Sequence, residues 1–240
     1  MLRPLAREER ALEHLDRTLP TADLAATLAD VERLNRRFAG HRLTLREVRR
    51  RLARVPRERR AVVVDVGGGR GDFALHLVRR CRRAGRSIRV IVVDRDAATV
   101  ALARAHCAGV PEVTVIQGDA TALPLREGGV DVAVSVLTLH HLAPDEAAAM
   151  LAEMRAAARG ALIVNDLWRS RLAWCAVWLT TRLFARHPFS CHDGPLSVRR
   201  AYSVGELAVL ADKARLGRVT IRRYPWLVRI LLVAPAEATA

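Results

Sequence analysis

Residues 62–72 read VVVDVGGGRGD, and this stretch decides the fold. A β-branched apolar run that closes on an acid predicts a buried strand. The glycine-rich turn and helical pattern after it are typical of a site for a nucleotide-like ligand. Glycines at Gly67, Gly69 and Gly71 let the backbone adopt positive φ and approach a ligand. Asp65 ends the predicted strand, where its carboxylate can accept hydrogen bonds from a cationic or amine-bearing ligand.

The pattern after residue 60 predicts a mostly parallel sheet, because short β-branched runs alternate with helical segments as in βαβ units. The predicted strands are residues 61–66, 87–94, 112–117, 130–136 and 161–165, followed by 218–223 and 226–233. Tyr224 and Pro225 part the last two, too few residues for a helical crossover, so these strands should form an antiparallel hairpin. The predicted fold is α/β: a Rossmann-like, seven-stranded, mostly parallel sheet with a C-terminal antiparallel hairpin.

Two helices are predicted before the first strand. Apolar residues recur every three or four positions through residues 24–38, and Gly40 stops this helix. Thr44 and Glu47 have capping-box spacing and predict the start of a second helix, which ends before Pro56. We expect both helices to cover the ligand cleft as an N-terminal helical lid.

The expected domain organisation follows from these elements. Residues 1–58 form the lid and residues 59–240 the main domain, in which residues 167–202 are an insertion that faces a second substrate. Residues 172–184 are the most apolar helical segment. They are too few to span a bilayer and include Arg182, so we expect no transmembrane segment. The helix could lie on a membrane surface, but burial inside the protein is the favoured interpretation.

The composition is typical of one α/β domain with an appendage. The 240 residues are 51% hydrophobic, enough to bury a full core, and the formal net charge is +15. All the basic residues but Lys213 are arginines, and they are spread over every predicted helix, which favours solvated surface charge over an anionic partner. The four cysteines form no CxxC pair and no signal peptide precedes the helices, so we expect reduced thiols in a cytoplasmic protein.

The glycine turn resembles the first motif of class I S-adenosylmethionine-dependent methyltransferases, Asp-x-Gly-x-Gly-x-Gly. The rival interpretation is the dinucleotide-binding fingerprint, which needs a third glycine three residues after the second. Asp72 occupies that position, where its charge would repel a pyrophosphate at the helix N-terminus. A nucleoside joined to a sulfonium amino acid would not be repelled.

Three further segments resemble later motifs of the same family. Residues 90–94 end a strand with Asp94, which in the family binds both ribose hydroxyls. Residues 118–120 resemble the adenine-binding motif, and residues 131–142 resemble the fourth motif, with the double histidine of ubiquinone-type small-molecule methyltransferases. The resemblance implies S-adenosylmethionine as the cofactor. The cofactor-binding residues that it implies are Asp65, Gly67, Gly69, Gly71, Asp94, Arg95, Asp119, Ala120 and Val136.

A looser resemblance concerns the methyl acceptor. Residues 34–42, 165–169 and 192–201 are similar to segments of bacterial methyltransferases found beside type III polyketide synthases. That resemblance implies a phenolic or polyketide-like small molecule, methylated at oxygen. Two alternatives stay open: an RNA or DNA methyltransferase, and a non-catalytic S-adenosylmethionine-binding protein. Nucleic acid is the less favoured partner, because aromatic residues make up 4% of the chain and base-methylation motifs are missing. A homodimer is also considered.

Candidate catalytic residues follow the fourth and fifth strands, because ligands of open α/β sheets bind at the carboxyl ends of the strands. His140 and His141 are the first candidates for a general base, since imidazole titrates near neutrality. Asp166 is the second candidate, and His192 with Asp193, on a predicted loop, is the third. No metal is expected, because the residues directly after the fourth strand lack the carboxylates of metal-dependent catechol methylation.

Two further groups could contact the acceptor. Trp174 and Trp178 lie four residues apart on one helical face, where core packing is favoured and an aromatic acceptor pocket is the alternative. Arg199, Arg200 and Tyr202 could hold an acidic acceptor, although such arginines more often lie on the surface.

Overall fold

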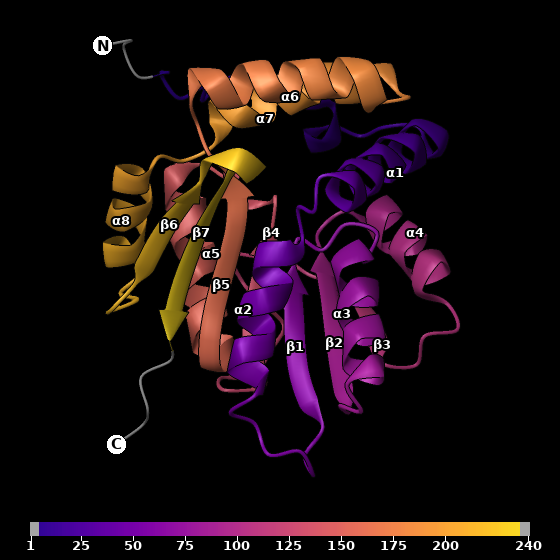
Figure 1. Ribbon diagram of the computed structural model, residues 1–240, viewed down its shortest axis with the longest axis vertical. Helices are drawn as coiled ribbons and strands as arrows, with labels where there is room; N and C mark the ends of the chain where they lie inside the picture. The colour runs from indigo at the N-terminus through magenta and orange to yellow at the C-terminus, as the bar shows by residue number, and fades with distance from the viewer. Residues whose placement is uncertain (1–4, 236–240) are drawn as a thin grey trace.

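The strands form one seven-stranded sheet, ordered β3-β2-β1-β4-β5-β7-β6, in a computed structural model that describes residues 5–235 (Figure 1). They are β1 (Ala61–Val66), β2 (Ile88–Asp94), β3 (Val113–Gln117), β4 (Val130–Val136), β5 (Ala158–Leu167), β6 (Thr220–Tyr224) and β7 (Arg229–Pro235). The first five strands pair in parallel, whereas β7 runs antiparallel between β5 and β6. The predicted α/β fold with its antiparallel hairpin is confirmed.

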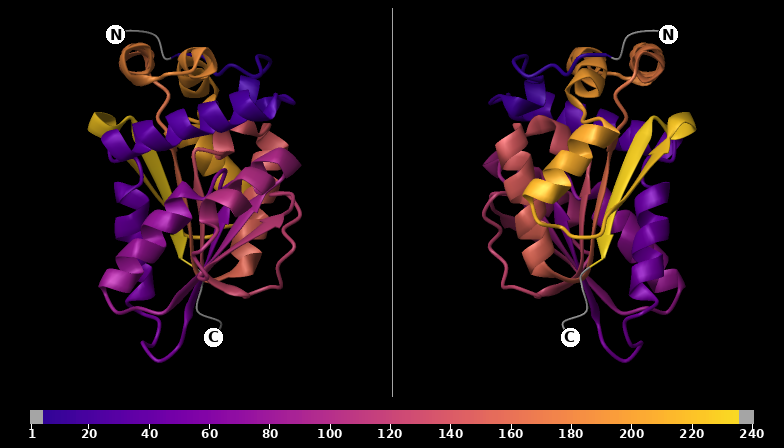
Figure 2. Two further views of the ribbon diagram at one scale, coloured as in Figure 1. Left: turned by 90° about the vertical axis from the view of Figure 1, so that its right-hand side faces the viewer. Right: turned by 90° about the vertical axis from the view of Figure 1, so that its left-hand side faces the viewer.

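Helices cover both faces of the sheet. They are α1 (Thr21–Arg37), α2 (Arg42–Leu52), α3 (Asp72–Arg83), α4 (Ala97–Cys107), α5 (Pro144–Ala157), α6 (Arg171–Phe184), α7 (Pro188–Arg200) and α8 (Val204–Lys213). Helices α2 and α3 pack on one face and α5 and α8 on the other (Figure 2). Neighbouring residues of β1 serve the two layers in turn: Val63 packs with α2 and α3, and Val64 with α5. Such alternation follows from the two-residue period of a strand.

A second group of helices lies across one end of the sheet. Figure 1 shows α1, α6 and α7 above the ends of the strands, with α6 outermost. Two 3₁₀ turns complete this end, η1 (His14–Asp16) before α1 and η2 (Leu139–His141) after β4. Within the described residues, no helix combines the length and the apolar character needed to cross a bilayer.

Helix α2 belongs to the core, contrary to the expectation that it forms part of a lid. It packs on the sheet through Leu45, Val48 and Leu52. It begins at Arg42, so the predicted capping box at Thr44 is wrong. The Thr44 side chain is buried instead and its Oγ accepts a hydrogen bond from the Asn165 amide at 2.9 Å. The residues that extend over the strand ends are therefore those before Gly40, and the sequence-based boundary at residue 58 does not coincide with a structural one.

Helices α6 and α7 also differ from expectation. Residues 188–200 were expected to include a loop around Asp193, but they form α7 with Gly194 and Pro195 inside it. Gly194 allows α6 to approach closely, because an added Cβ would lie 2.6 Å from Cγ2 of Thr181. The expected burial of residues 172–184 is wrong, since α6 rests on α7 as the outermost layer and keeps one side in solvent.

The start of the last strand differs as well. The sequence predicts a strand from residue 226, but residues 225–227 form the 3₁₀ turn η3 (Pro225–Leu227). Val228 follows with φ of 55°, and pairing with β5 and β6 begins only at Arg229. A proline cannot donate to the strand ladder, which explains the delay.

Candidate active site

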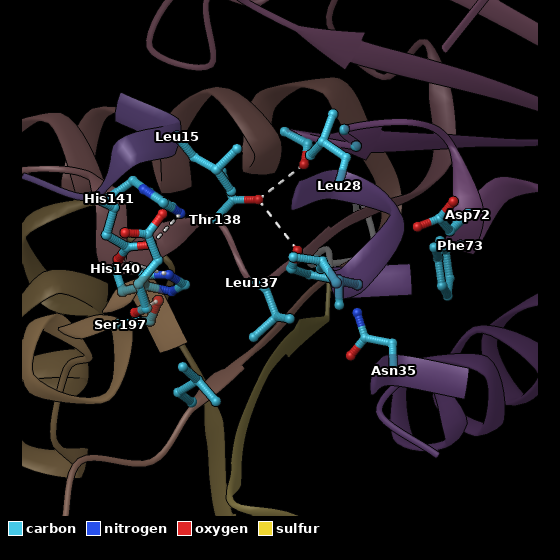
Figure 3. A pocket seen from close by; sticks show the side chains of 18 of the residues that line it. Leu15, Leu28, Asn35, Asp72, Phe73, Leu137, Thr138, His140, His141 and Ser197 are labelled. Carbon is cyan, nitrogen blue, oxygen red and sulfur yellow. Dashed lines mark hydrogen bonds and ion pairs between the residues drawn. The ribbon is translucent and has the colours of Figure 1, made fainter. Parts of the chain in front are cut away.

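A cavity of about 700 Å³ lies between the strand ends and the helices above them. Its floor comes from the turns after β1, β2 and β4, and its roof from α1, α6 and α7. Figure 3 shows two ends: Asp72 and Phe73 lie near the glycine turn, and His140 and His141 lie at the opposite end. A cavity with two such ends suits two ligands that contact each other inside it.

The turn after β1 has the geometry that the glycines predict. Gly67 and Gly69 adopt φ of 66° and 52°, which is the left-handed region. A Cβ on Gly67 would overlap the side chain of Thr138, whose hydroxyl donates to the Gly67 carbonyl at 3.1 Å. Gly71, with φ of 83°, precedes α3, and a Cβ there would lie 2.7 Å from Cys107 Sγ. Gly71 therefore shapes the turn rather than the cavity wall.

Three carboxyl groups surround this turn, of which Asp65 is buried and Asp72 and Asp94 are half-buried. Asp65 is 1% exposed, and neither of its oxygens has a hydrogen-bond partner within residues 5–235. Burial, reinforced by Asp72 and Asp94, raises the pKa of Asp65 to about 8. Burial and the charge of Glu32 raise the pKa of Asp72 to about 7. A cationic ligand would favour the ionised forms of these carboxyl groups and compensate their charge.

Asp94 ends β2, and Asp119 lies two residues beyond the end of β3. Asp94 accepts a hydrogen bond from the backbone N–H of Gly69 at 3.1 Å, and burial raises its pKa. Asp119 accepts from the N–H and hydroxyl of Thr121 at 2.8 and 2.7 Å, and the first of these lowers its pKa. Eight of the nine predicted cofactor residues line the cavity, namely Asp65, Gly67, Gly69, Asp94, Arg95, Asp119, Ala120 and Val136.

His140 is held by Asp166 at the other end of the cavity. Its ring Nδ1 lies 2.6 Å from Asp166 Oδ1, and its backbone N–H donates to Oδ2 at 3.0 Å. Burial opposes the charge of Asp166, but His140 and the N–H of Leu167 outweigh it and lower the pKa of Asp166. In the tautomer whose Nδ1–H donates to this carboxylate, Nε2 is the ring's acceptor, and Oε1 of Glu13 lies 3.7 Å from it.

His141 is held by two acids that sequence reasoning missed. Its Nδ1 lies 2.6 Å from Asp16 Oδ1, and its Nε2 lies 3.9 Å from Glu13 Oε2. Burial opposes a charge on His141, but Glu13 and Asp16 prevail and raise its pKa to about 9. His141 is therefore a cation at neutral pH and a poor base. Glu13 and Asp16 stand three residues apart in a 3₁₀ capping box, a spacing that by itself indicates a helix cap.

Arg200 ties this cluster together. It is 6% exposed, donates to the carbonyls of His140 and His141 at 3.3 and 2.8 Å, and pairs with Asp16. Ligand atoms of Glu13, His140 and His141 lie within 4.8 Å of one another, a spacing that a metal ion could bridge. The arginine is thus neither a surface charge nor free to hold an acidic acceptor.

Of the remaining candidates, Asp193 lines the cavity and the others do not. The His192 side chain is 57% exposed, and Asp193 holds the ring of His14 at 2.7 Å. Trp174 and Trp178 lie outside the cavity lining, which receives Val177 and Thr180 from the same helix. Tyr202 is buried and donates to the Leu142 carbonyl at 2.7 Å, while Arg199 pairs with Glu8.

Comparison with known proteins agrees with this fold. Residues 63–160 match the family described as "Methyltransferase domain". Over 84 residues, 35% of the chain, the sequence is 35% identical to indolepyruvate C-methyltransferase of Streptomyces griseus, and the match spans 25% of that protein. The chain thus spans about a quarter of the length of the curated relative it matches.

Solved structures share the fold at low identity. The citrinin polyketide synthase CMeT domain is similar with a TM-score of 0.59 and 13% identity, over 77% of this chain and 49% of that one. Magnesium protoporphyrin IX methyltransferase of Synechocystis PCC 6803, with bound S-adenosylhomocysteine, gives 0.54 and 18%, over 83% and 84%. A S-adenosylmethionine-dependent methyltransferase of Aquifex aeolicus gives 0.53 and 20%, over 73% and 82%.

The seven-stranded sheet has the Rossmann-like fold of methyltransferases. Residues 63–160, which hold the glycine turn, match the methyltransferase-domain family. The buried, unpaired carboxyl group of Asp65 fits the ammonium and sulfonium charges of S-adenosylmethionine.

Proposed function

We propose that this enzyme methylates a hydroxyl group of an apolar, phenolic or polyketide-type small molecule, with His140 as the general base. The observation that carries the proposal is the pairing of His140 with Asp166 on the wall of the cavity opposite the glycine turn. When bound, S-adenosylmethionine supplies an electrophilic methyl group on a sulfonium. We assign its binding to the eight cavity-lining residues around the glycine turn and the neighbouring strand ends, with Gly71 supporting the turn.

The two histidines then have different roles. Nε2 of His140 takes the proton of the acceptor hydroxyl as the oxygen bonds to the methyl carbon, and the pair of electrons of the breaking bond stays on sulfur. Asp166 stabilises the imidazolium that forms, and cationic His141 stabilises negative charge on the acceptor oxygen. The base His140 and the cation His141 need fixed positions, which their contacts with Arg200 and Glu13 support.

The segment before Gly40, with α6 and α7, is proposed to act as a cap over the cavity. It brings Leu28, Val177 and Thr180 to the cavity wall. An apolar roof excludes water from the reacting atoms and favours an aromatic or aliphatic acceptor. Glu13 caps η1 and Asp16 ends it, so this segment supplies both acids of the cluster around His141.

Carbon methylation is the second candidate, because a named relative is a C-methyltransferase and a solved neighbour is a CMeT domain. The same histidine could remove a proton from an acidic carbon beside a carbonyl. The test is incubation with methyl-labelled S-adenosylmethionine and a panel of resorcinols, quinols, acidic phenols, β-ketoacyl compounds and total RNA. We expect label in a phenol, with an O-methyl signal by NMR; label in RNA, or in no compound, would refute the proposal.

A further inference from the structure

Helix α6 exposes apolar side chains that the cavity does not use. Leu172, Leu179 and Leu183 are 79%, 52% and 63% exposed, and Trp178 is 40% exposed. They recur at helical spacing on the side opposite Ala173 and Thr181, which are buried against α7. We name Leu172, Trp178, Leu179 and Leu183 the α6 face. Contiguous exposed apolar groups of this kind usually mark an interaction surface.

The charged side chains of the segment that contains the α6 face are all basic. Residues 167–192 contain no Asp or Glu, whereas Arg171, Arg182 and Arg186 are exposed along and beyond the helix. The Arg182 guanidinium lies over the Trp178 ring, 5.2 Å from its centroid. Arginines in such positions place their aliphatic stems beside apolar side chains and their cationic ends in water. This arrangement suits the boundary between the acyl chains and the anionic headgroups of a lipid bilayer.

The position of α6 allows such contact. It is the outermost element in Figure 1, and its axis lies across the strand ends. A helix of 14 residues is about 21 Å long, which suits a helix that lies in the plane of a membrane surface and not one that spans it. The same helix also lines the cavity, through Ala176, Val177 and Thr180.

We propose that the α6 face docks this enzyme on an anionic lipid bilayer, from which an apolar acceptor enters the cavity beneath α6. The entry of the acceptor rests on the proposed function, whereas the docking does not. The charge pattern favours anionic lipid over a second copy of the chain, because two α6 faces would bring arginines of like sign together. Salt should weaken the docking, since it screens the arginine contribution.

The test is sedimentation of the full chain with vesicles of phosphatidylcholine alone, or of phosphatidylcholine and phosphatidylglycerol in a three-to-one ratio. We expect binding to the anionic vesicles, weakened by salt, and at least tenfold weaker binding by the double variant Leu179→Gln, Leu183→Gln. The matched control is Val209→Gln on α8, which removes an apolar side chain that is 66% exposed at another place. It should bind as the unmodified chain does.

Absence of vesicle binding by the unmodified chain, or equal binding by the double variant, would overturn the proposal. The proposal would also be overturned if the unmodified chain formed a dimer and bound no vesicles while the double variant was a monomer. Sedimentation velocity measures this and also tests the homodimer considered from the sequence. Methylation of a water-soluble phenol without vesicles is measured in parallel and should not change in the double variant. If neither the unmodified chain nor the variants methylate the phenol while the unmodified chain binds vesicles, the proposed function is refuted and the docking proposal stands.

Discussion

The carboxylate of Asp166 contacts His140 twice, accepting from the backbone N–H at 3.0 Å and lying 2.6 Å from ring Nδ1. The first contact fixes the turn after β4 and the second fixes the ring and its tautomer. One side chain on β5 thus determines where the turn after β4 presents the His140 ring. This relationship separates the role of His140 from that of His141, which the sequence could not do.

Removal of the base should slow chemistry and leave cofactor binding intact. We expect His140→Gln to lower kcat by roughly 10²–10⁴-fold and Asp166→Asn to lower it by roughly tenfold or more. The Kd of S-adenosylhomocysteine, measured by calorimetry, should change less than about threefold. His192→Gln is the control and should retain full activity. Full turnover by His140→Gln would disprove the assignment of the base.

The charge on His141 should make stability depend on pH. Its pKa is about 9 in the folded protein against an ordinary value of 6.5. The group binds its proton more tightly when folded, so its contribution is complete below pH 6.5 and is lost as pH rises to 9. We expect the free energy of unfolding to fall by roughly 2 kcal/mol over this window in denaturant titrations. The loss should be much smaller in Asp16→Asn.

Cofactor binding should release a proton from Asp65. Its pKa of about 8 keeps it protonated at pH 7, and a cationic ligand favours the ionised form. Affinity for S-adenosylmethionine should therefore rise between pH 6 and pH 8 and level off above it. Calorimetry at pH 7 in phosphate and in Tris, two buffers that differ in ionisation enthalpy, gives the number of protons released when the cofactor binds. Asp65→Asn should bind at least about tenfold more weakly; if the variant binds equally well, Asp65 does not hold the cofactor.

Gly67→Ala should damage the cofactor site through a specific collision. The new methyl group would overlap Thr138 at a φ of 66°. Gly85 supplies the matched control, because its φ is 59° but a Cβ there meets nothing within 4 Å. Thermal unfolding should show Gly67→Ala to be destabilised by roughly 2 kcal/mol more than Gly85→Ala. Cofactor affinity should fall in the former and not in the latter; an equal effect at both sites would show that φ strain alone matters.

The core and the cofactor end follow from local sequence, because strand ends and glycine turns place their residues within a few positions along the chain. Asp65 and Asp94 lie at the ends of predicted strands, Asp119 lies two residues after one, and all three line one cavity. Gly71 is the exception, since its glycine is needed for packing against Cys107.

The acceptor end could be predicted only in part. His140 and Asp166 follow neighbouring strands, so the topology indicates that they meet. Glu13 and Asp16 reach the site from the start of the chain, and no periodicity encodes that contact. α7 was missed because Gly194 and Pro195 are typical of loops, whereas here the glycine permits close packing with α6.

The tie between Asp16 and its partners carries a consequence for synthesis. His141 and Arg200 stand 125 and 184 residues later in the sequence. Asp16 is therefore synthesised long before η2 and α7, the elements that hold these two partners. Contacts of such sequence separation form late in folding. Until α7 has been made, Asp16 lacks Arg200, and the wall of the cavity around His141 is incomplete.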